Sequence, residues 1–336
     1  MENRAVNSRY SSLSNLSINE QANITINLCN FFAVLNAKKL REELGLPIKE
    51  KVVESLKLID FLTYMKIKGL DLWPKMQRIQ ELVEKLKRHN VLQYRGGLDL
   101  NASFFFMREF TEREKKGRLW LGSILGSAYI GHEIEKDIVY IEGTTPKGDI
   151  SVGTGTLIKG GVILTCAHVV DDMNVDYVKI RGKRFGIRST SSHKVVDVGL
   201  IFLDENIEPL SKDIAFRNSK LLEPIVISGY PTIPRSLSPC YTLQTGEISG
   251  QIENTMDSYP MDLFSAIARP GNSGGPVLGM DGCITGIVTR SLERHQEEND
   301  AMAVLPFFAS VPASEIGRCI DEITDGGIDV PWENYA

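Results

Sequence analysis

Cysteine is scarce in this 336-residue sequence, and its positions exclude two kinds of architecture. The five cysteines are an odd number at scattered spacings, and no CxxC pair occurs among them. A disulfide framework would need a regular, even set, and a structural zinc site would need closely spaced ligands. We therefore expect reduced and mostly buried thiols and no cofactor; the cysteines are Cys29, Cys166, Cys240, Cys283 and Cys319.

Long apolar runs are also absent. No stretch of about 18 uncharged apolar residues occurs, as a membrane-spanning helix would require. The first residues are polar and lack the apolar core of a signal peptide. A net charge of -5 argues against indiscriminate binding of nucleic acid or membranes by the whole chain. We expect a cytoplasmic protein without membrane contact.

The first third of the sequence has helical periodicity. Apolar residues recur at helical spacing over residues 28–35, 52–62 and 79–86, which predicts three helices. Two short β-prone runs, residues 91–94 and 103–106, follow them around a turn that contains two glycines. Helices followed by a hairpin resemble a winged-helix domain in pattern. We expect the phenylalanines of this region to serve as core; they are Phe104, Phe105, Phe106 and Phe110.

From about Asp137 onward the sequence changes to short strands at close spacing, separated by turns that contain glycine or proline. Regular strands without intervening helices predict an antiparallel sandwich or barrel. The expected organisation is a disordered tail (1–17), a helical or winged-helix-like interaction or regulatory domain (18–118), a linker (119–136), a mainly β domain (137–325) and a C-terminal tail (326–336).

One histidine differs from the other four in its context. His168 ends a buried apolar strand in the stretch T-C-A-H-V-V, residues 165–170. An imidazole in such a place needs a hydrogen-bonding partner. Its partner is either a backbone group at the strand end or the carboxylate that orients a catalytic base.

A carboxylate of the kind that such a base requires occurs 29 residues later. The run V-V-D-V-G-L-I-F-L places Asp197 among apolar residues, where an unpaired charge is costly. An imidazole N–H would compensate that charge. Asp171 and Asp172 lie nearer to His168 in sequence, but we interpret them as solvated loop charges.

A candidate nucleophile lies in the loop P-G-N-S-G-G-P, residues 270–276. Glycines around Ser273 permit a tight loop whose Gly271 and Ser273 N–H groups converge on one point. Such a nest would stabilise a developing oxyanion. The alternative is a plain surface turn, since Asn, Ser and Gly all favour turns.

Together these segments resemble the trypsin-like serine proteases of the chymotrypsin fold, in particular HtrA-type and related bacterial intracellular peptidases. T-C-A-H-V-V resembles the family's base motif, D-V-G-L-I-F-L its aspartate strand and G-N-S-G-G-P its nucleophile loop. I-S-G-Y-P, residues 227–231, resembles the strand that precedes that loop. The resemblance covers about residues 135–325.

The resemblance implies a fold and a mechanism. The fold is an antiparallel double β-barrel, six strands in each barrel, here preceded by a smaller, mostly helical domain. His168 is the implied general base and then acid, Asp197 orients it, and Ser273 attacks the peptide carbonyl. The N–H groups of Gly271 and Ser273 form the implied oxyanion hole.

Asn272 departs from the secreted trypsins, which have an aspartate before the nucleophile to pair with a newly cut N-terminus. An amide cannot form that ion pair. We therefore expect control by rearrangement of the oxyanion loop, driven by the N-terminal domain or a partner, rather than by N-terminal trimming.

The expected substrate pocket is lined by Ile267, Arg269, Thr289 and Arg290. Ile267 stands where trypsin has an acidic pocket floor, which favours a small or apolar P1 residue over Lys or Arg. In the alternative, Arg269 or Arg290 selects an acidic P1 residue.

Residues 75–118 contain eleven basic and six acidic residues, a local excess of five positive charges. A charge excess of this size is typical of a solvated face. In the functional interpretation, the region binds a partner protein or acts as an autoinhibitory module, with nucleic acid as the weaker alternative. The resulting prediction is a regulated intracellular serine endopeptidase that acts on proteins or peptides, recruited through residues 18–118, in a bacterial signalling or defence system. The rival is a catalytically silent scaffold or nucleic-acid-binding regulator.

Overall fold

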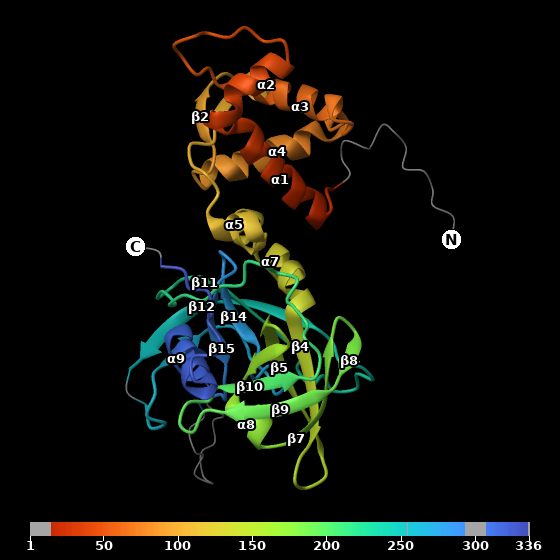
Figure 1. Cartoon of the computed structure of the whole chain (residues 1–336), viewed down its shortest axis with the longest axis vertical. Helices are drawn as coiled ribbons and strands as arrows, with labels where there is room; N and C mark the ends of the chain where they lie inside the picture. Colours follow the sequence, from red (N-terminus) through yellow and green to blue (C-terminus); the bar gives the residue numbers. More distant parts are fainter. Residues whose placement is uncertain (1–14, 254, 293–306, 335–336) are drawn as a thin grey trace, which may run out of the picture. The chain divides into compact units, whose positions relative to one another are not determined.

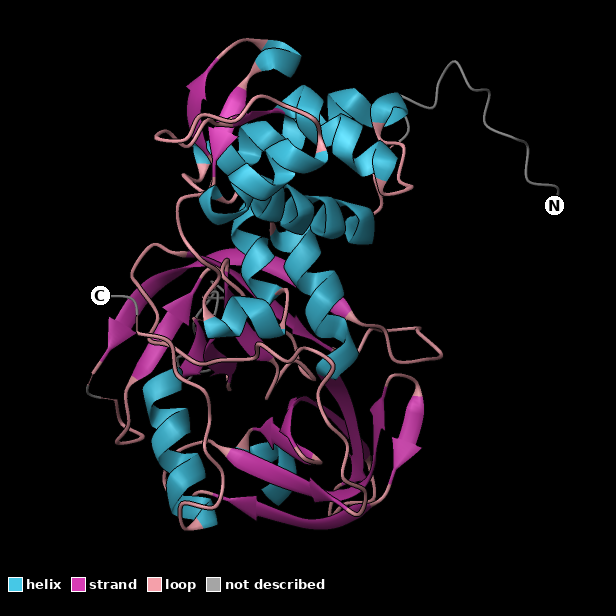
Figure 2. Cartoon of the chain, turned by 45° about the horizontal axis from the view of Figure 1, so that its top comes forward, coloured by secondary structure: helices cyan, strands magenta, loops and turns pink. Residues whose placement is uncertain are grey.

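The computed structural model describes residues 15–253, 255–292 and 307–334, and the chain divides into two compact units. The described part of the first unit is residues 15–115 and 123–125; the second unit contains residues 116–122 and the described residues from 126 onward. Helices predominate in the first unit and strands in the second (Figure 2). Within the described ranges, every helix is too short or too polar to span a bilayer.

The longer helices of the first unit are α1 (Ile18–Phe32), α2 (Ala37–Glu43), α3 (Leu58–Ile67) and α4 (Met76–Arg88), and the short helix α5 (Glu112–Lys116) follows later in the chain (Figure 1). A capping box starts α1, because the Ser17 hydroxyl accepts from Glu20 N–H and the Glu20 carboxylate accepts from Ser17 N–H. The buried face of α4 has the expected helical spacing, with Ile79, Leu82, Val83 and Leu86 all buried.

A small antiparallel sheet accompanies these helices. Its strands are β1 (Leu56–Lys57), β2 (Gln93–Gly96) and β3 (Ser103–Phe105), in the order β1-β3-β2. Helices followed by the hairpin β2–β3 are the winged-helix-like pattern expected from the sequence. The single helix predicted over 52–62 is wrong, because Leu56 pairs with Phe104 in β1 and the helix begins only at Leu58.

Aromatic rings form the core of the first unit. The Phe32 and Phe104 ring centroids lie 5.3 Å apart, and those of Phe31 and Phe61 lie 5.4 Å apart. Phe104 and Phe106 are buried, so these side chains pack in the core as expected.

Ion pairs within this unit engage part of its basic surface. Each of five basic residues between 75 and 118 is paired: Lys75 with Glu20, Arg78 with Glu81, Lys87 with Glu84, Arg108 with Glu114, and Lys115 with Glu112. The positive excess counted in the sequence is therefore partly neutralised on the folded surface.

The second unit begins with a seven-stranded antiparallel sheet in the order β8-β7-β4-β5-β6-β10-β9. The strands are β4 (Ile138–Thr144), β5 (Ile150–Lys159), β6 (Val162–Thr165), β7 (Asn174–Ile180), β8 (Lys183–Phe185), β9 (Ile187–Ser192) and β10 (Gly199–Leu203). The short helix α8 (Ala167–Asp171) directly follows β6. The sheet has one strand more than the expected six, since β8 folds back on β7 as a short hairpin partner.

Six strands then close into a barrel in the order β11-β12-β13-β16-β15-β14. They are β11 (Pro224–Gly229), β12 (Thr242–Ile252), β13 (Met261–Phe264), β14 (Pro276–Gly279), β15 (Ile284–Val288) and β16 (Phe308–Pro312). Helix α9 (Ala313–Thr324) completes the unit. The expected mainly β double-barrel architecture, preceded by a smaller helical part, is confirmed.

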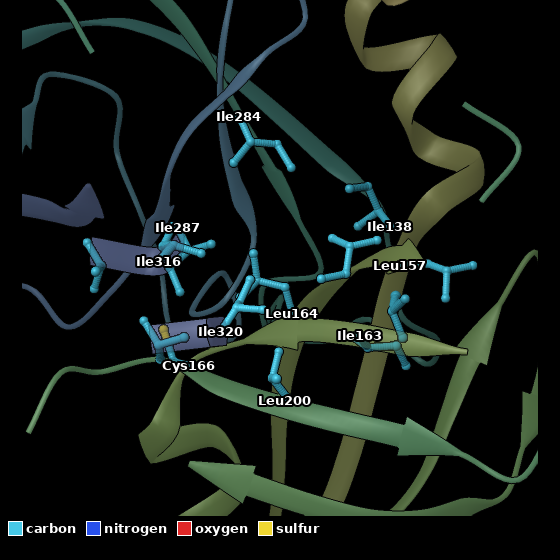
Figure 3. Packing of buried hydrophobic residues seen from close by; sticks show 14 of the residues in the cluster. Ile138, Leu157, Ile163, Leu164, Cys166, Leu200, Ile284, Ile287, Ile316 and Ile320 are labelled. Atoms are coloured by element: carbon cyan, nitrogen blue, oxygen red, sulfur yellow. The ribbon is translucent and has the colours of Figure 1, made fainter. Parts of the chain in front are cut away.

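One apolar cluster joins the seven-stranded sheet, the barrel and α9 (Figure 3). Leu164 and Leu200 of the sheet, Ile287 of the barrel and Ile316 of α9 are all fully buried in it. A separate cluster, which includes Ile225 and Phe264, packs inside the barrel. The first cluster fixes the two β elements against each other, and the loops between them carry the candidate site.

The structure corrects two expected boundaries of the β domain. Residues 119–136, expected as a linker, contain the helix α7 (Ser127–Ile134), and Leu119, Ile130 and Ile134 are fully buried in the core of the second unit. Residues 326–334, within the expected tail, lie along Phe216, whose N–H donates to Pro331 O at 2.8 Å. The sequence of both segments lacks the alternating pattern of a strand, so they were not assigned to the β domain. Their apolar side chains nevertheless complete its core.

Candidate active site

His168 and Asp197 lie in direct contact. His168 belongs to the first turn of α8, immediately after β6, and Asp197 lies in the loop that enters β10. The Nδ1 of His168 is 2.8 Å from Asp197 Oδ2 and 3.0 Å from Oδ1, and His168 N–H donates to Oδ1 at 3.0 Å. Since an ionised carboxylate only accepts, Nδ1 carries the proton and Nε2 is left as the basic nitrogen.

Asp197 is held in its ionised form. Burial by itself would raise its pKa, but the hydrogen bond and charge of His168, the Thr289 hydroxyl and His168 N–H lower the pKa of Asp197 to about 2. The carboxylate is therefore negative throughout the neutral range, as an orienting group for an imidazole must be.

Thr289, expected in the substrate pocket, also contacts the Asp197 carboxylate directly. Its hydroxyl donates to Asp197 Oδ2, and the residue is buried. Thr289 directly follows β15, so the barrel supplies this contact to a carboxylate that the sheet carries. A polar residue that directly follows a buried strand was the only signal available in the sequence.

The nucleophile loop is folded tightly against β6. Gly271 and Gly274 have left-handed backbone conformations, with φ of 96° and 81°. A Cβ on Gly274 would lie 2.2 Å from Thr165 Oγ1 and 2.3 Å from Thr154 O, so only glycine permits the approach that brings Ser273 beside the strand leading to His168. Among the described residues, no hydrogen bond joins Ser273 Oγ to His168; such catalytic hydrogen bonds often tighten only in complexes.

The carbonyls that precede the two expected oxyanion donors are both engaged. Pro270 O accepts from Thr232 N–H at 2.9 Å, and Asn272 O accepts from Gly275 N–H at 2.9 Å. In a trans peptide the N–H points away from the carbonyl, and the described residues contain no cis peptide bond. The N–H groups of Gly271 and Ser273 therefore point away from these contacts, and within the described chain neither has a partner.

Asn272 is buried, and its Oδ1 has no hydrogen-bond partner among the described residues. Asn272 stands directly before the nucleophile, where the secreted trypsins have an aspartate that pairs with the new N-terminus. In this protein the buried side chain is an uncharged amide, which cannot form that ion pair.

A cavity of about 300 Å³ adjoins His168 and Asp197. Thr289 and Arg290 line it, but Ile267 and Arg269 do not. The Arg290 guanidinium is paired with Asp172 at 2.7 Å, and both side chains are exposed. Ile267 is half-exposed, and Arg269 lies on the surface. The four expected pocket residues are therefore not gathered around one cavity.

Cys166, His168 and Asp197 are the one group in the described ranges whose ligand atoms could surround a metal ion, all within 4.8 Å of one another. Burial raises the pKa of the Cys166 thiol, which donates to Val288 O at 3.2 Å. His168 and Asp197 are already bonded to each other. The three residues thus form a hydrogen-bonded histidine–aspartate pair next to a buried, neutral thiol.

Comparisons with known proteins show what the second unit is similar to. Residues 153–287 match the model of the trypsin-like peptidase domain. An HtrA-like serine protease of Staphylococcus epidermidis is 30% identical over 206 residues, covering 54% of this chain and 32% of the relative. The HtrA-like serine protease of Staphylococcus aureus is 26% identical over 224 residues, covering 58% and 28%. The chain thus spans about a third of the length of these relatives.

Two solved structures are also similar. The Rv3671c protease of M. tuberculosis in its active form has a TM-score of 0.46 at 22% identity, covering 60% of this chain and 86% of that one. The HtrA-type protease AlgW with a tripeptide has a TM-score of 0.48 at 17% identity, covering 60% and 64%. The family match over residues 153–287 places a trypsin-like peptidase domain in the second unit. In sequence, that domain is similar to the HtrA-like serine proteases, as the resemblance implied.

Proposed function

We propose that this protein is a serine endopeptidase. Ser273 Oγ attacks the substrate carbonyl while His168 Nε2 takes its proton, and Asp197 stabilises the imidazolium that forms. The N–H groups of Gly271 and Ser273 hold the oxyanion, and His168 then protonates the departing amine. Water releases the acyl group from Ser273 by the same steps in reverse. The observation that carries the proposal is the 2.8 Å contact of His168 Nδ1 with Asp197 Oδ2, which leaves Nε2 basic.

Covalent labelling with a fluorophosphonate probe tests this function. We expect labelling of the wild type and none of Ser273→Ala. Ser189→Ala removes an exposed hydroxyl of β9 and should label like the wild type. A wild type that stays unlabelled under all conditions, including with candidate partners, would instead support the catalytically silent scaffold.

The proposal includes a preference for a small or apolar P1 residue. Ile267 offers no charge to a basic side chain, and the Arg290 guanidinium is engaged by Asp172, which argues against Arg290 as a selector of acidic residues. Cleavage of a peptide library should therefore show small or apolar P1 residues. Dominant cleavage after Lys or Arg would contradict this preference, and cleavage after Asp or Glu would favour Arg269.

We also propose control by a partner that binds residues 18–118, as in an effector of a bacterial signalling or defence system. The separate apolar core of the first unit supports this proposal, and the uncharged Asn272 supports control without N-terminal trimming. Crosslinking of full-length Ser273→Ala in its host should join the partner to lysines within 18–118. Crosslinks confined to the second unit, or activity only after cleavage near Asp137, would contradict this mode of control.

A further inference from the structure

Thr154 contacts the nucleophile loop through both its side chain and its backbone. It lies in β5 of the seven-stranded sheet and is fully buried. Its Oγ1 lies 2.6 Å from Gly271 O and 2.9 Å from Tyr230 N, and its backbone N–H donates to Ser273 O at 2.9 Å. One residue of the sheet thus reaches the loop of the barrel at two points.

The direction of these hydrogen bonds follows from their chemistry. Tyr230 N–H can only donate, so the Thr154 oxygen accepts from it. The single hydroxyl proton is then available for Gly271 O, which can only accept. The Thr154 hydroxyl therefore donates to one group and accepts from another, and a side chain without it leaves the partly buried Tyr230 N–H and the buried Gly271 C=O unpaired.

The carbonyl that Thr154 binds lies between the two oxyanion donors. Gly271 O belongs to the peptide that connects Gly271 to Asn272, and the donors on either side are Gly271 N–H and Ser273 N–H. With Pro270 O and Asn272 O engaged by Thr232 and Gly275, the Thr154 bond completes the anchoring of three successive carbonyls. Rotation of the first or the third of these peptides would turn a donor away from the substrate, and the peptide that Thr154 anchors is the link between those two.

The same hydroxyl also fixes the wall on which this turn rests. A Cβ on Gly271 would lie 2.6 Å from Tyr230 O, so Gly271 packs directly on the Tyr230 segment. Because Tyr230 N–H is bound to Thr154, a change at Thr154 loosens the turn and its support together.

Thr156 shows that the position in β5 does not by itself demand a bonded hydroxyl. It lies two residues further along the same strand and is equally buried, but its Oγ1 has no partner among the described residues. Thr156 is therefore a matched control for the loss of a buried threonine hydroxyl.

We infer that Thr154 is a positioning residue whose hydroxyl holds the oxyanion loop in its catalytically competent form. This inference rests on the proposed peptidase function. Thr154 itself does not touch the reacting atoms; it acts through Gly271.

The test compares three full-length variants by steady-state kinetics on a peptide substrate and by thermal unfolding. Thr154→Val should lower kcat about 10- to 100-fold with little change in KM, because a misplaced oxyanion donor is felt in the transition state. Thr154→Ser should keep kcat within about threefold of wild type, and Thr156→Val should leave it unchanged. A folded Thr154→Val with kcat within about threefold of wild type overturns the inference, as does an equal loss in Thr156→Val.

Two further experiments cover a variant that does not fold and a wild type that is inactive. If Thr154→Val does not fold, Thr154→Ala replaces it, with the same threshold for kcat. If the wild type neither cleaves peptides nor reacts with a fluorophosphonate, the proposed function fails, but the hydroxyl can still be tested by hydrogen exchange. Residues 268–275 should then exchange faster in Thr154→Val than in Thr156→Val, and equal rates overturn the positioning role.

Discussion

The Thr289 hydroxyl donates a hydrogen bond to Oδ2 of Asp197, the same oxygen that lies 2.8 Å from His168 Nδ1. The two β elements of the peptidase domain therefore meet at one carboxylate: the sheet provides Asp197, and the barrel provides Thr289. A carboxylate with donors on both sides has little freedom to rotate. Its orientation toward the imidazole is thus set by residues 92 positions apart in the sequence.

Thr289→Val should lower kcat about tenfold without changing the fold. A hydrogen bond to a charged group contributes about 1.5 kcal/mol or more, which is about tenfold in rate if it acts only on the orientation of Asp197. Steady-state kinetics on a peptide substrate measure the change. Thr285→Val is the control, because the Thr285 hydroxyl is also buried but donates to Val277 O, away from Asp197. Equal losses of kcat in the two variants would show a general packing effect.

Asp197→Asn should leave the fold intact and lower kcat about 10⁴-fold, as expected when the orienting group can no longer select the reactive imidazole tautomer. Asp172→Asn, which changes an exposed partner of Arg290, should keep its activity. Circular dichroism and peptide-cleavage rates provide the two measurements. A loss below tenfold would assign the orienting role to another residue.

The stability of the second unit should depend on pH through Asp197. The pKa of this group is lowered from 3.8 to about 2 in the folded protein, so its contribution is fully present above about pH 4 and is lost as the pH falls through about 2. The difference in unfolding free energy between wild type and Asp197→Asn should therefore fall by about 2 kcal/mol between about pH 5 and pH 2. Urea unfolding at a series of pH values measures it. A difference independent of pH would contradict the ionised state assigned to the folded protein.

The catalytic candidates could be predicted from the sequence because polar or charged side chains stand within apolar runs. His168 at the end of an apolar strand and Asp197 within an apolar run each demanded a partner, and the structure pairs them. The mainly β architecture followed from short strands with turns between them. These signals are local, so a single sequence displays them.

The missed features depend on contacts between distant segments. Val52 and Val53 continue a helical pattern, but pairing of Leu56 with Phe104 overrides that periodicity. Thr154 and Thr156 look alike in G-T-G-T, and only the folded loop above β5 gives one hydroxyl two partners and the other none. Ile130 and Ile134 did carry a signal, since apolar residues four apart indicate a buried helical face within the expected linker.

A buried ion-pair network links three loop residues next to the barrel strands. The Arg217 guanidinium is 2.7 Å from Glu223 Oε2 and 2.7 Å from Asp281 Oδ2, and it makes a second contact with each carboxylate. The Arg217 side chain is only 8% exposed. Its loss would leave these two poorly hydrated carboxylates without the cation that they share.

Arg217→Met should therefore lower the unfolding free energy of the second unit by about 3–5 kcal/mol, the range found when one partner of a buried pair is removed. Arg318→Met is the control: Arg318 pairs with Glu315 and Glu322 on the exposed face of α9, where such pairs contribute at most about 1 kcal/mol. Urea unfolding, followed through the loss of peptidase activity, measures both variants. Similar destabilisation in the two would mean that burial does not govern the strength of the Arg217 network. A large loss confined to Arg217→Met would show that this arginine compensates both carboxylates.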